Sequence, residues 1–129
     1  MKHLIIIGAR RWGREVYAAA MGTKAYHDGE FDIKGFLDNK ADAFEGLRGN
    51  YPPILCAPEE YEIQEDDVFF VAMGEPQWRK HYAELMEAKR AKYMSIIYDS
   101  ASLNPTALVG EGAFIGGSTV VSDNVTIGK

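Results

Sequence analysis

The stretch LIIIGARRWGREV, residues 4–16, decides how the first part of this chain folds. Four aliphatic residues run into Gly8, and good helix formers without a breaker follow Gly13. A short apolar run that ends at a glycine is typical of a strand buried on both faces, as in a parallel sheet. We therefore expect a strand over His3–Ile7, a turn bounded by the two glycines, and a helix over Gly13–Met21.

The alternation of strand and helix continues to about residue 98. A second helix is expected from Pro76 to about Ala91, because proline is tolerated at a first helical position. Elements that alternate in this way predict an α/β fold with a Rossmann-like parallel sheet. Apolar runs bounded by turn residues predict the remaining strands at Asp32–Leu37, Val68–Met73 and Met94–Tyr98, with a short apolar piece at Ile54–Leu55.

One face of the second helix carries an apolar stripe. Trp78, Tyr82, Leu85 and Lys89 recur at helical spacing, and Lys89 contributes its aliphatic stem. Such a stripe is typical of a helix that packs on a core.

From Leu103 onward the pattern changes to a repeat of six residues. A small or β-branched residue stands four places after each aliphatic one, and glycine follows three of them directly. This spacing is typical of a parallel β-helix with short, flat sides. A β-meander is the alternative, but it would need five consecutive coincidences of spacing. The aliphatic first positions are Leu103, Val109, Ile115, Val121 and Ile127.

Composition narrows the function classes. The 129 residues are 47% hydrophobic and 26% charged, which suits a soluble globular protein. The net charge of −5, without a block of like charges, argues against a nucleic acid or a membrane surface as partner. The apolar runs are too short for a signal peptide or a membrane span, so a cytoplasmic location is expected. The single cysteine, Cys56, excludes an internal disulfide and a Cys-type zinc site, and we expect it to serve packing.

The turn between the first strand and the first helix is the main candidate site. Backbone N–H groups and the helix dipole attract an anion at such a place. Three arginines crowd this helix start, where each cation is disfavoured by about 0.3–1 kcal/mol unless an anion is bound. A solvated basic turn is the alternative. The residues expected to bind a diphosphate are Gly8, Ala9, Arg10, Arg11, Gly13 and Arg14.

Two further loops follow predicted strands, at the carboxyl ends where parallel sheets place their ligands. Asp38, Asn39 and Lys40 follow the second strand, and the carboxylate could accept hydrogen bonds from a ligand there. Ala72, Met73, Gly74 and Glu75 end a third strand, and Gly74 would let a sugar approach the backbone. Plain turns are the alternative at both places.

The histidines are not placed as catalytic residues. His3 opens a strand, His27 lies in a His-Asp-Gly turn, and His81 flanks the apolar stripe. We expect structural or surface roles for all three, and we assign no catalytic residue within this chain.

Taken together, the motifs resemble those of bacterial hexapeptide-repeat sugar acetyltransferases, the sialic-acid O-acetyltransferase and UDP-amino-sugar N-acetyltransferase family. The resemblance implies a Rossmann-like nucleotide-sugar-binding domain over residues 1–100, which holds the nucleoside with the stretch 38–40. It implies the start of a left-handed parallel β-helix over residues 101–129. The matching pieces, in the family's order, are LIIIGARRWGREV at 4–16, GFLDN at 35–39, VAMG at 71–74 followed by Arg79, and the repeats from Leu103.

The resemblance also implies an activity. Members transfer an acyl group from acetyl-CoA, the co-substrate, to an amine or hydroxyl of a UDP-linked sugar, without a metal and as a homotrimer. Their catalytic histidine lies further along the β-helix than Lys129. At three hexads to a coil, the 27 residues from Leu103 make about one and a half coils, so we expect a truncated repeat.

Two other functions stay open. One is a non-catalytic nucleotide-sugar-binding or assembly domain. The other is an NAD(P)-binding Rossmann oxidoreductase, whose fingerprint would need glycine at position 10 so that the backbone could touch the pyrophosphate. Arg10 and the hexapeptide repeat argue against the second.

Overall fold

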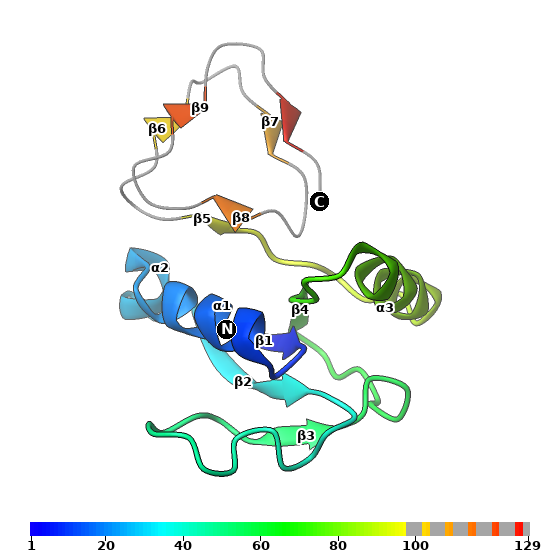
Figure 1. Cartoon of the computed structure of the whole chain (residues 1–129). Coiled ribbons are helices and arrows are strands. Elements are labelled where there is room, and N and C mark those ends of the chain that lie inside the picture. The colour runs from blue at the N-terminus through cyan, green and yellow to red at the C-terminus, as the bar shows by residue number, and fades with distance from the viewer. Residues whose placement is uncertain (98–101, 104–107, 110–113, 116–119, 122–125, 128–129) are drawn as a thin grey trace.

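The computed structural model describes residues 1–97 and five short strands beyond them, at 102–103, 108–109, 114–115, 120–121 and 126–127; from residue 97 onward only the backbone is described. Four strands form a parallel sheet in the order β3-β2-β1-β4 (Figure 1). The predicted Rossmann-like α/β sheet is therefore confirmed. The strands are β1 Lys2–Ile7, β2 Phe31–Leu37, β3 Ile54–Cys56 and β4 Asp67–Val71.

The central strand β1 is buried on both faces because a helix covers each face of the sheet. Helix α1, Arg11–Met21, packs on the face of the sheet that carries the side chains of Leu4 and Ile6. Helix α3, Pro76–Ala88, packs on the opposite face, which carries the side chains of Ile5 and Ile7. All four of these β1 side chains have no exposed surface, which explains why this strand is a continuous apolar run.

The helices differ from the prediction at their ends. Helix α1 begins at Arg11, two residues early, and α3 ends at Ala88, where Lys89 is the C-cap. A short helix α2, Lys24–His27, stands where a polar interval was expected, so His27 ends a helix rather than lying in a turn. Thr23 nucleates α2 because its hydroxyl oxygen accepts a hydrogen bond from the N–H of Tyr26.

The predicted stripe on α3 is correct for Tyr82 but wrong for Trp78. Tyr82 and Met86 are the buried residues of this helix, whereas Trp78 is 52% exposed. The physical reason is that Trp78, in the first turn of α3, borders the cavity at the carboxyl edge of the sheet instead of packing in the core.

After α3 the chain runs along the edge of β4 and then leaves the sheet. Tyr93 forms a single parallel bridge with Phe69, and the N–H of Met94 donates to the Phe69 carbonyl over 3.0 Å. The following strand, β5 Ile96–Ile97, is shorter than the predicted strand over Met94–Tyr98, of which Tyr98 lies outside the described residues.

The strands beyond residue 97 form three parallel pairs. Each pair joins positions 18 residues apart in the chain: β5 with β8 Phe114–Ile115, β6 Ser102–Leu103 with β9 Val120–Val121, and β7 Leu108–Val109 with β10 Thr126–Ile127. The aliphatic first residue of every hexad is the second residue of its strand. Figure 1 shows the three pairs around a triangle, with β5–β8 nearest to the sheet. In the described part of the chain, no helix is long and apolar enough to cross a membrane.

Candidate functional site

The turn between β1 and α1 requires its two glycines because backbone approaches backbone there. Gly8 has φ +107°, and a Cβ at this position would lie 2.7 Å from the Ala72 carbonyl oxygen. A Cβ at Gly13 would lie 1.7 Å from the Gly8 carbonyl oxygen. The turn therefore brings β1, the start of α1 and the end of β4 together at one edge of the sheet.

Asp38 anchors this turn from the end of β2. Its carboxylate is buried, with 5% of the side chain exposed. Oδ2 accepts a hydrogen bond from the N–H of Ala9 over 2.8 Å, and Oδ1 accepts one from the N–H of Lys40 over 2.8 Å. The Arg10 Nε lies 3.9 Å from Oδ2. The structure thus shows Asp38 holding the turn, and its contact with a nucleoside stays a prediction.

The start of α1 is a helix N-terminus without a side-chain cap. The N-cap, Arg10, makes no side-chain cap, and the first turn contains no acidic residue. Because the first N–H groups of a helix lack intrahelical partners, they and the helix dipole present positive charge here. The side chain of Arg10 is 72% exposed, and Arg11 pairs with Glu15 over 3.4 Å. Arg14 differs, since its Nη1 donates to the Ala9 carbonyl over 3.2 Å and so supports the turn.

A cavity of about 510 Å³ lies at this edge of the sheet. Strand order reverses between β1 and β4, and open α/β sheets bind ligands at such switch points, outside the carboxyl ends of the strands. All three predicted loops contribute to the lining. The predicted residues that line the cavity are Gly8, Arg10, Arg11, Asp38, Asn39, Ala72, Met73, Gly74 and Glu75.

Four predicted residues lie outside the lining. Ala9 and Gly13 are buried inside the turn, Arg14 is bound to the Ala9 carbonyl, and Lys40 is exposed beyond Asp38. Ala9, Gly13 and Arg14 therefore shape the turn in this structure, and whether they touch a ligand stays a prediction.

Sequence reasoning missed four lining residues: Trp12, Pro58, Trp78 and Tyr82. Tyr82 and Asn39 meet across the cavity, because the Asn39 Nδ2 donates to the Tyr82 Oη over 3.0 Å. Burial, followed by the nearby carboxylate of Glu59, raises the pKa of Tyr82, so this hydroxyl is protonated at neutral pH. Trp12 could have been found from its place inside the predicted turn, whereas Pro58 carried no local signal.

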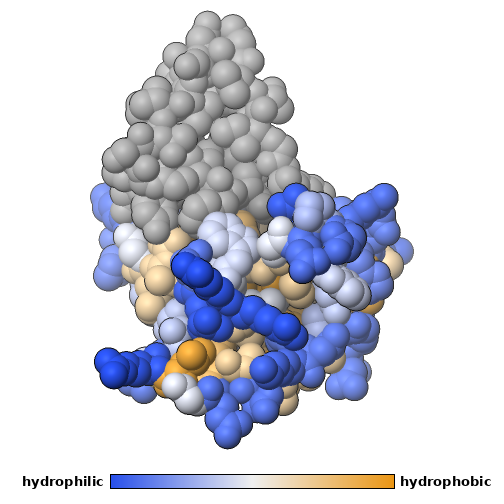
Figure 2. Space-filling view, viewed as in Figure 1, coloured by the Kyte–Doolittle hydropathy of each residue, from blue (hydrophilic) through white to orange (hydrophobic). Residues whose placement is uncertain are grey.

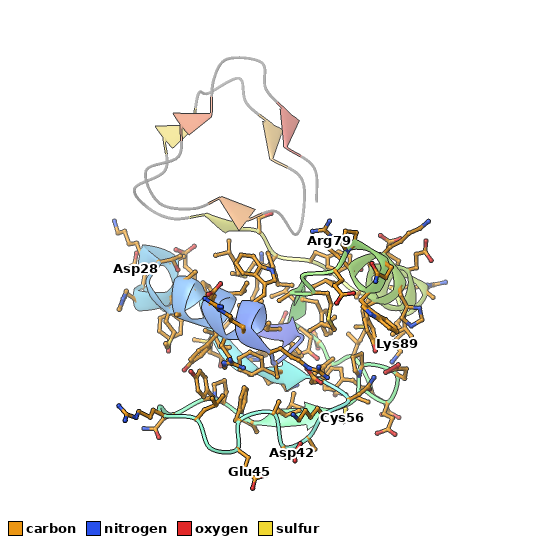
Figure 3. The ribbon with its side chains drawn as sticks, viewed as in Figure 1. Asp28, Asp42, Glu45, Cys56, Arg79 and Lys89 are labelled. Atoms are coloured by element: carbon orange, nitrogen blue, oxygen red, sulfur yellow. The ribbon has the colours of Figure 1, made fainter. Side chains whose placement is uncertain are left out.

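Pro58 belongs to a loop that a lysine holds in place. The ammonium group of Lys89 donates to the carbonyls of Pro58, Glu59 and Tyr61 over 2.8, 3.1 and 3.0 Å. Figure 3 shows Lys89 beside α3, of which it is the C-cap. Three hydrogen bonds from one charged group fix the backbone that forms this wall of the cavity.

The far end of the same loop is held by a second set of hydrogen bonds. The Tyr61 hydroxyl donates to the buried carboxylate of Asp67 over 2.7 Å, and Lys34 donates to that hydroxyl over 2.7 Å. The hydrogen bond to Tyr61 raises the pKa of Lys34 despite partial burial. The loop is therefore tied to β2 and β4 as well as to α3.

No histidine lines the cavity within the described residues. The His3 Nδ1 lies 2.6 Å from Asp32 Oδ1 at the amino ends of the strands, and His27 and His81 are exposed. Cys56 packs in the core on the α3 side, and burial raises the pKa of its thiol. Among the described residues, no three His, Cys, Asp or Glu side chains gather in a way that could hold a metal ion.

Fold and cavity together define a Rossmann-like domain with a cavity at the switch point of its parallel sheet. Residues 3–86 match the PglD N-terminal domain family, and the chain belongs to this family. The resemblance inferred from the sequence motifs is thus confirmed.

Individual relatives agree with this assignment. The chain is 29% identical over 119 residues to UDP-N-acetylbacillosamine N-acetyltransferase of Bacillus subtilis strain 168, a match covering 89% of this chain and 51% of that protein. The chain therefore spans about half the length of the curated relative it matches.

Two solved structures share the fold. The acetyltransferase domain of PglB from Neisseria gonorrhoeae FA1090, in complex with acetyl coenzyme A, is 25% identical with a TM-score of 0.72; the match covers 99% of this chain and 59% of that chain. PerB from Caulobacter crescentus, in complex with CoA and GDP-perosamine, has a TM-score of 0.74 at 19% identity; the match covers 100% of this chain and 58% of that chain. At that identity, the likeness to PerB shows the fold alone.

Proposed function

We propose that this chain is the acceptor-binding part of an acetyltransferase that acts on an amino group of a UDP-linked sugar. One observation carries the proposal: the uncapped start of α1, with Arg10 and Arg11 beside it, opens into a cavity at the switch point. Its volume of about 510 Å³ falls within the usual size range of small-molecule sites. The Bacillus subtilis relative is an N-acetyltransferase, which supports transfer to nitrogen rather than to oxygen.

In this proposal the diphosphate lies at the start of α1. The first N–H groups of the helix and the exposed guanidinium of Arg10 donate to its oxygens, and the dipole favours its charge. The nucleoside then extends toward Asn39, and the sugar passes Gly74, where a side chain would meet no atom within 4 Å.

The transfer needs groups beyond this cavity. The sugar amine attacks the thioester carbonyl carbon of acetyl-CoA, the C–N bond forms, the C–S bond breaks, and CoA leaves as a thiolate. A general base takes the amine proton, which contributes about 10²–10⁴-fold to rate, and backbone N–H groups stabilise the oxyanion. We place this base, a histidine, on the repeat region, following the family resemblance.

We further propose that the three parallel pairs begin a left-handed parallel β-helix of hexapeptide repeats. The 18-residue separation within each pair equals three hexads, one for each side of a coil. A domain boundary near residue 100, a homotrimer with acetyl-CoA between neighbouring β-helices, and a cytoplasmic location belong to the same proposal.

Calorimetry tests the binding step. UDP and a UDP-amino-sugar should bind and NAD should not, and Arg10→Ala should weaken UDP binding about tenfold, as for the loss of one hydrogen bond to a charged group. Lys2→Ala, at the opposite edge of the sheet, is the control and should leave UDP affinity unchanged. Tight NAD binding without a response to UDP would reverse the assignment. CoA release from acetyl-CoA in the presence of UDP-amino-sugars separates an enzyme from a non-catalytic binding domain.

A further inference from the structure

Trp78 is unusual among the apolar residues of this protein because it is large, exposed and inside the cavity. Among the described residues, the large exposed hydrophobic side chains are Met1, Leu47, Leu55 and Trp78, and only Trp78 lines the cavity. The Trp78 residue is 52% exposed, and covering its apolar surface with a ligand would be favourable. Its place at the cavity points to a ligand as that cover.

The ring of Trp78 is held by its own helix. The Tyr82 ring lies one turn further along α3, with its centroid 6.4 Å from that of Trp78 and an interplanar angle of 30°. The His81 ring meets Trp78 edge-on, at 6.0 Å and 90°. Because these neighbours support the indole from within the helix, it presents a preformed flat surface, which lowers the entropy lost on binding.

Hydrogen-bonding groups lie close to this flat surface, because Tyr82 contacts the Trp78 ring and also forms a hydrogen bond with Asn39. The Tyr82 Oη accepts the Asn39 amide over 3.0 Å, which leaves the hydroxyl hydrogen and the Asn39 carbonyl oxygen to meet polar edges of a ligand. The arginines and the start of α1 supply the positive charge of the cavity. Figure 2 shows strongly hydrophilic residues beside apolar surface on one face of the described domain. A flat ring with polar edges, joined to an anion, fits these three features together.

We infer that Trp78 stacks on the nucleobase of the bound nucleotide sugar, and so fixes the nucleoside end of the ligand on the α3 side of the cavity. The inference rests on the proposed function and deepens it. Stacking of a base on an aromatic side chain recognises the π-face that every base has, whereas the sugar and the phosphates lack such a face.

The test measures affinities of Trp78→Ala and Trp78→Phe for UDP, for a UDP-amino-sugar and for inorganic pyrophosphate. Loss of a base–aromatic stack should weaken UDP about 5- to 150-fold in Trp78→Ala, with a smaller loss in Trp78→Phe. Pyrophosphate affinity should not change, because it has no base. Leu47→Ala removes an exposed apolar side chain outside the cavity and is the matched control.

Other results have distinct meanings. If Trp78→Ala binds UDP like the parent and loses affinity only for the UDP-amino-sugar, the indole contacts the sugar, and the inference is wrong. An equal loss for UDP and pyrophosphate would place Trp78 against the phosphates and would also overturn it. Failure of the parent protein to bind UDP would instead contradict the proposed function. Both tryptophans of the chain line the cavity, so Trp78→Phe leaves Trp12 as the sole indole and shows which of them UDP quenches.

Discussion

Replacing Gly13 by alanine should destabilise this protein, although the same change in most helices does the opposite. Gly13 is the third residue of α1, and alanine is more favourable than glycine inside a helix by about 0.8–1.0 kcal/mol. The structure reverses the sign because the new Cβ would lie 1.7 Å from the Gly8 carbonyl oxygen and 2.7 Å from its carbon.

The size of the effect follows from what must move. Real Cβ contacts are not shorter than 3.0 Å, so the helix start and the Gly8 carbonyl must separate by at least 1.3 Å. The obstacle is backbone, which cannot rotate away, and Gly8 is itself tied to Leu37 by a 2.8 Å hydrogen bond. Overpacking costs about 1–3 kcal/mol, and the upper end applies here because backbone meets backbone. Subtracting the helix gain of about 1 kcal/mol leaves an expected net loss of about 2 kcal/mol.

Thermal and denaturant unfolding of Gly13→Ala measure this loss. A drop in Tm of roughly 10 °C is expected for a domain of this size. Gly22→Ala, at the C-cap of the same helix, is the matched control, because a Cβ there meets its nearest atom at an ordinary 3.4 Å. Its stability should change by less than about 0.5 kcal/mol. A Gly13→Ala protein as stable as its parent would refute the account of this turn.

Further predictions concern the anchors of the cavity. Asp38→Ala removes the acceptor of two backbone N–H groups and should lower the free energy of unfolding by about 2–4 kcal/mol in denaturant titration. Asp42→Ala, on the outer loop in Figure 3, should leave the free energy of unfolding unchanged. Equal stability of the two variants would contradict the anchoring role of Asp38. Lys89→Met keeps the aliphatic stem but loses three hydrogen bonds, so amide exchange at 59–61 should accelerate and UDP binding should weaken. Lys80→Met, an exposed change on α3, should alter neither the amide exchange nor the UDP affinity. Unchanged amide exchange in Lys89→Met would show that Lys89 does not hold the loop.

The sheet could be predicted from the sequence because its information is local. A strand buried on both faces is apolar where it is buried, and Leu4–Ile7 of β1 and Val68–Val71 of β4 are continuous apolar runs. The place of Asp38 near the first turn also followed, since parallel strands end at a common edge. The hydrogen bond that Asp38 accepts from the N–H of Ala9 could not be predicted, because that contact joins residues 29 positions apart.

The parts that sequence could not supply depend on what lies opposite a residue. Helical spacing placed Trp78 and Tyr82 on one stripe, but spacing does not show where the sheet beneath that stripe ends. Tyr82 lies above the sheet and is buried, while Trp78 lies beyond its edge. Helix α2 was missed for a different reason: one hydroxyl cap on Thr23 nucleates four residues, too few for any periodic pattern.

The arginine at position 10 has a structural explanation that also bears on the ligand. Arg10 has φ −84° and ψ −167°, an extended conformation that any residue adopts, so packing does not demand glycine there. Within this turn, only Gly8 and Gly13 must be glycine, because a Cβ at either position would collide with a backbone carbonyl. A dinucleotide site uses the missing glycine to bring backbone against pyrophosphate, and this turn cannot do so in the same way. An anion bound here must rely on the helix start together with the exposed guanidinium of Arg10. For that reason the Arg10→Ala variant should lose far more UDP affinity than a glycine-rich turn would lose from any single side chain.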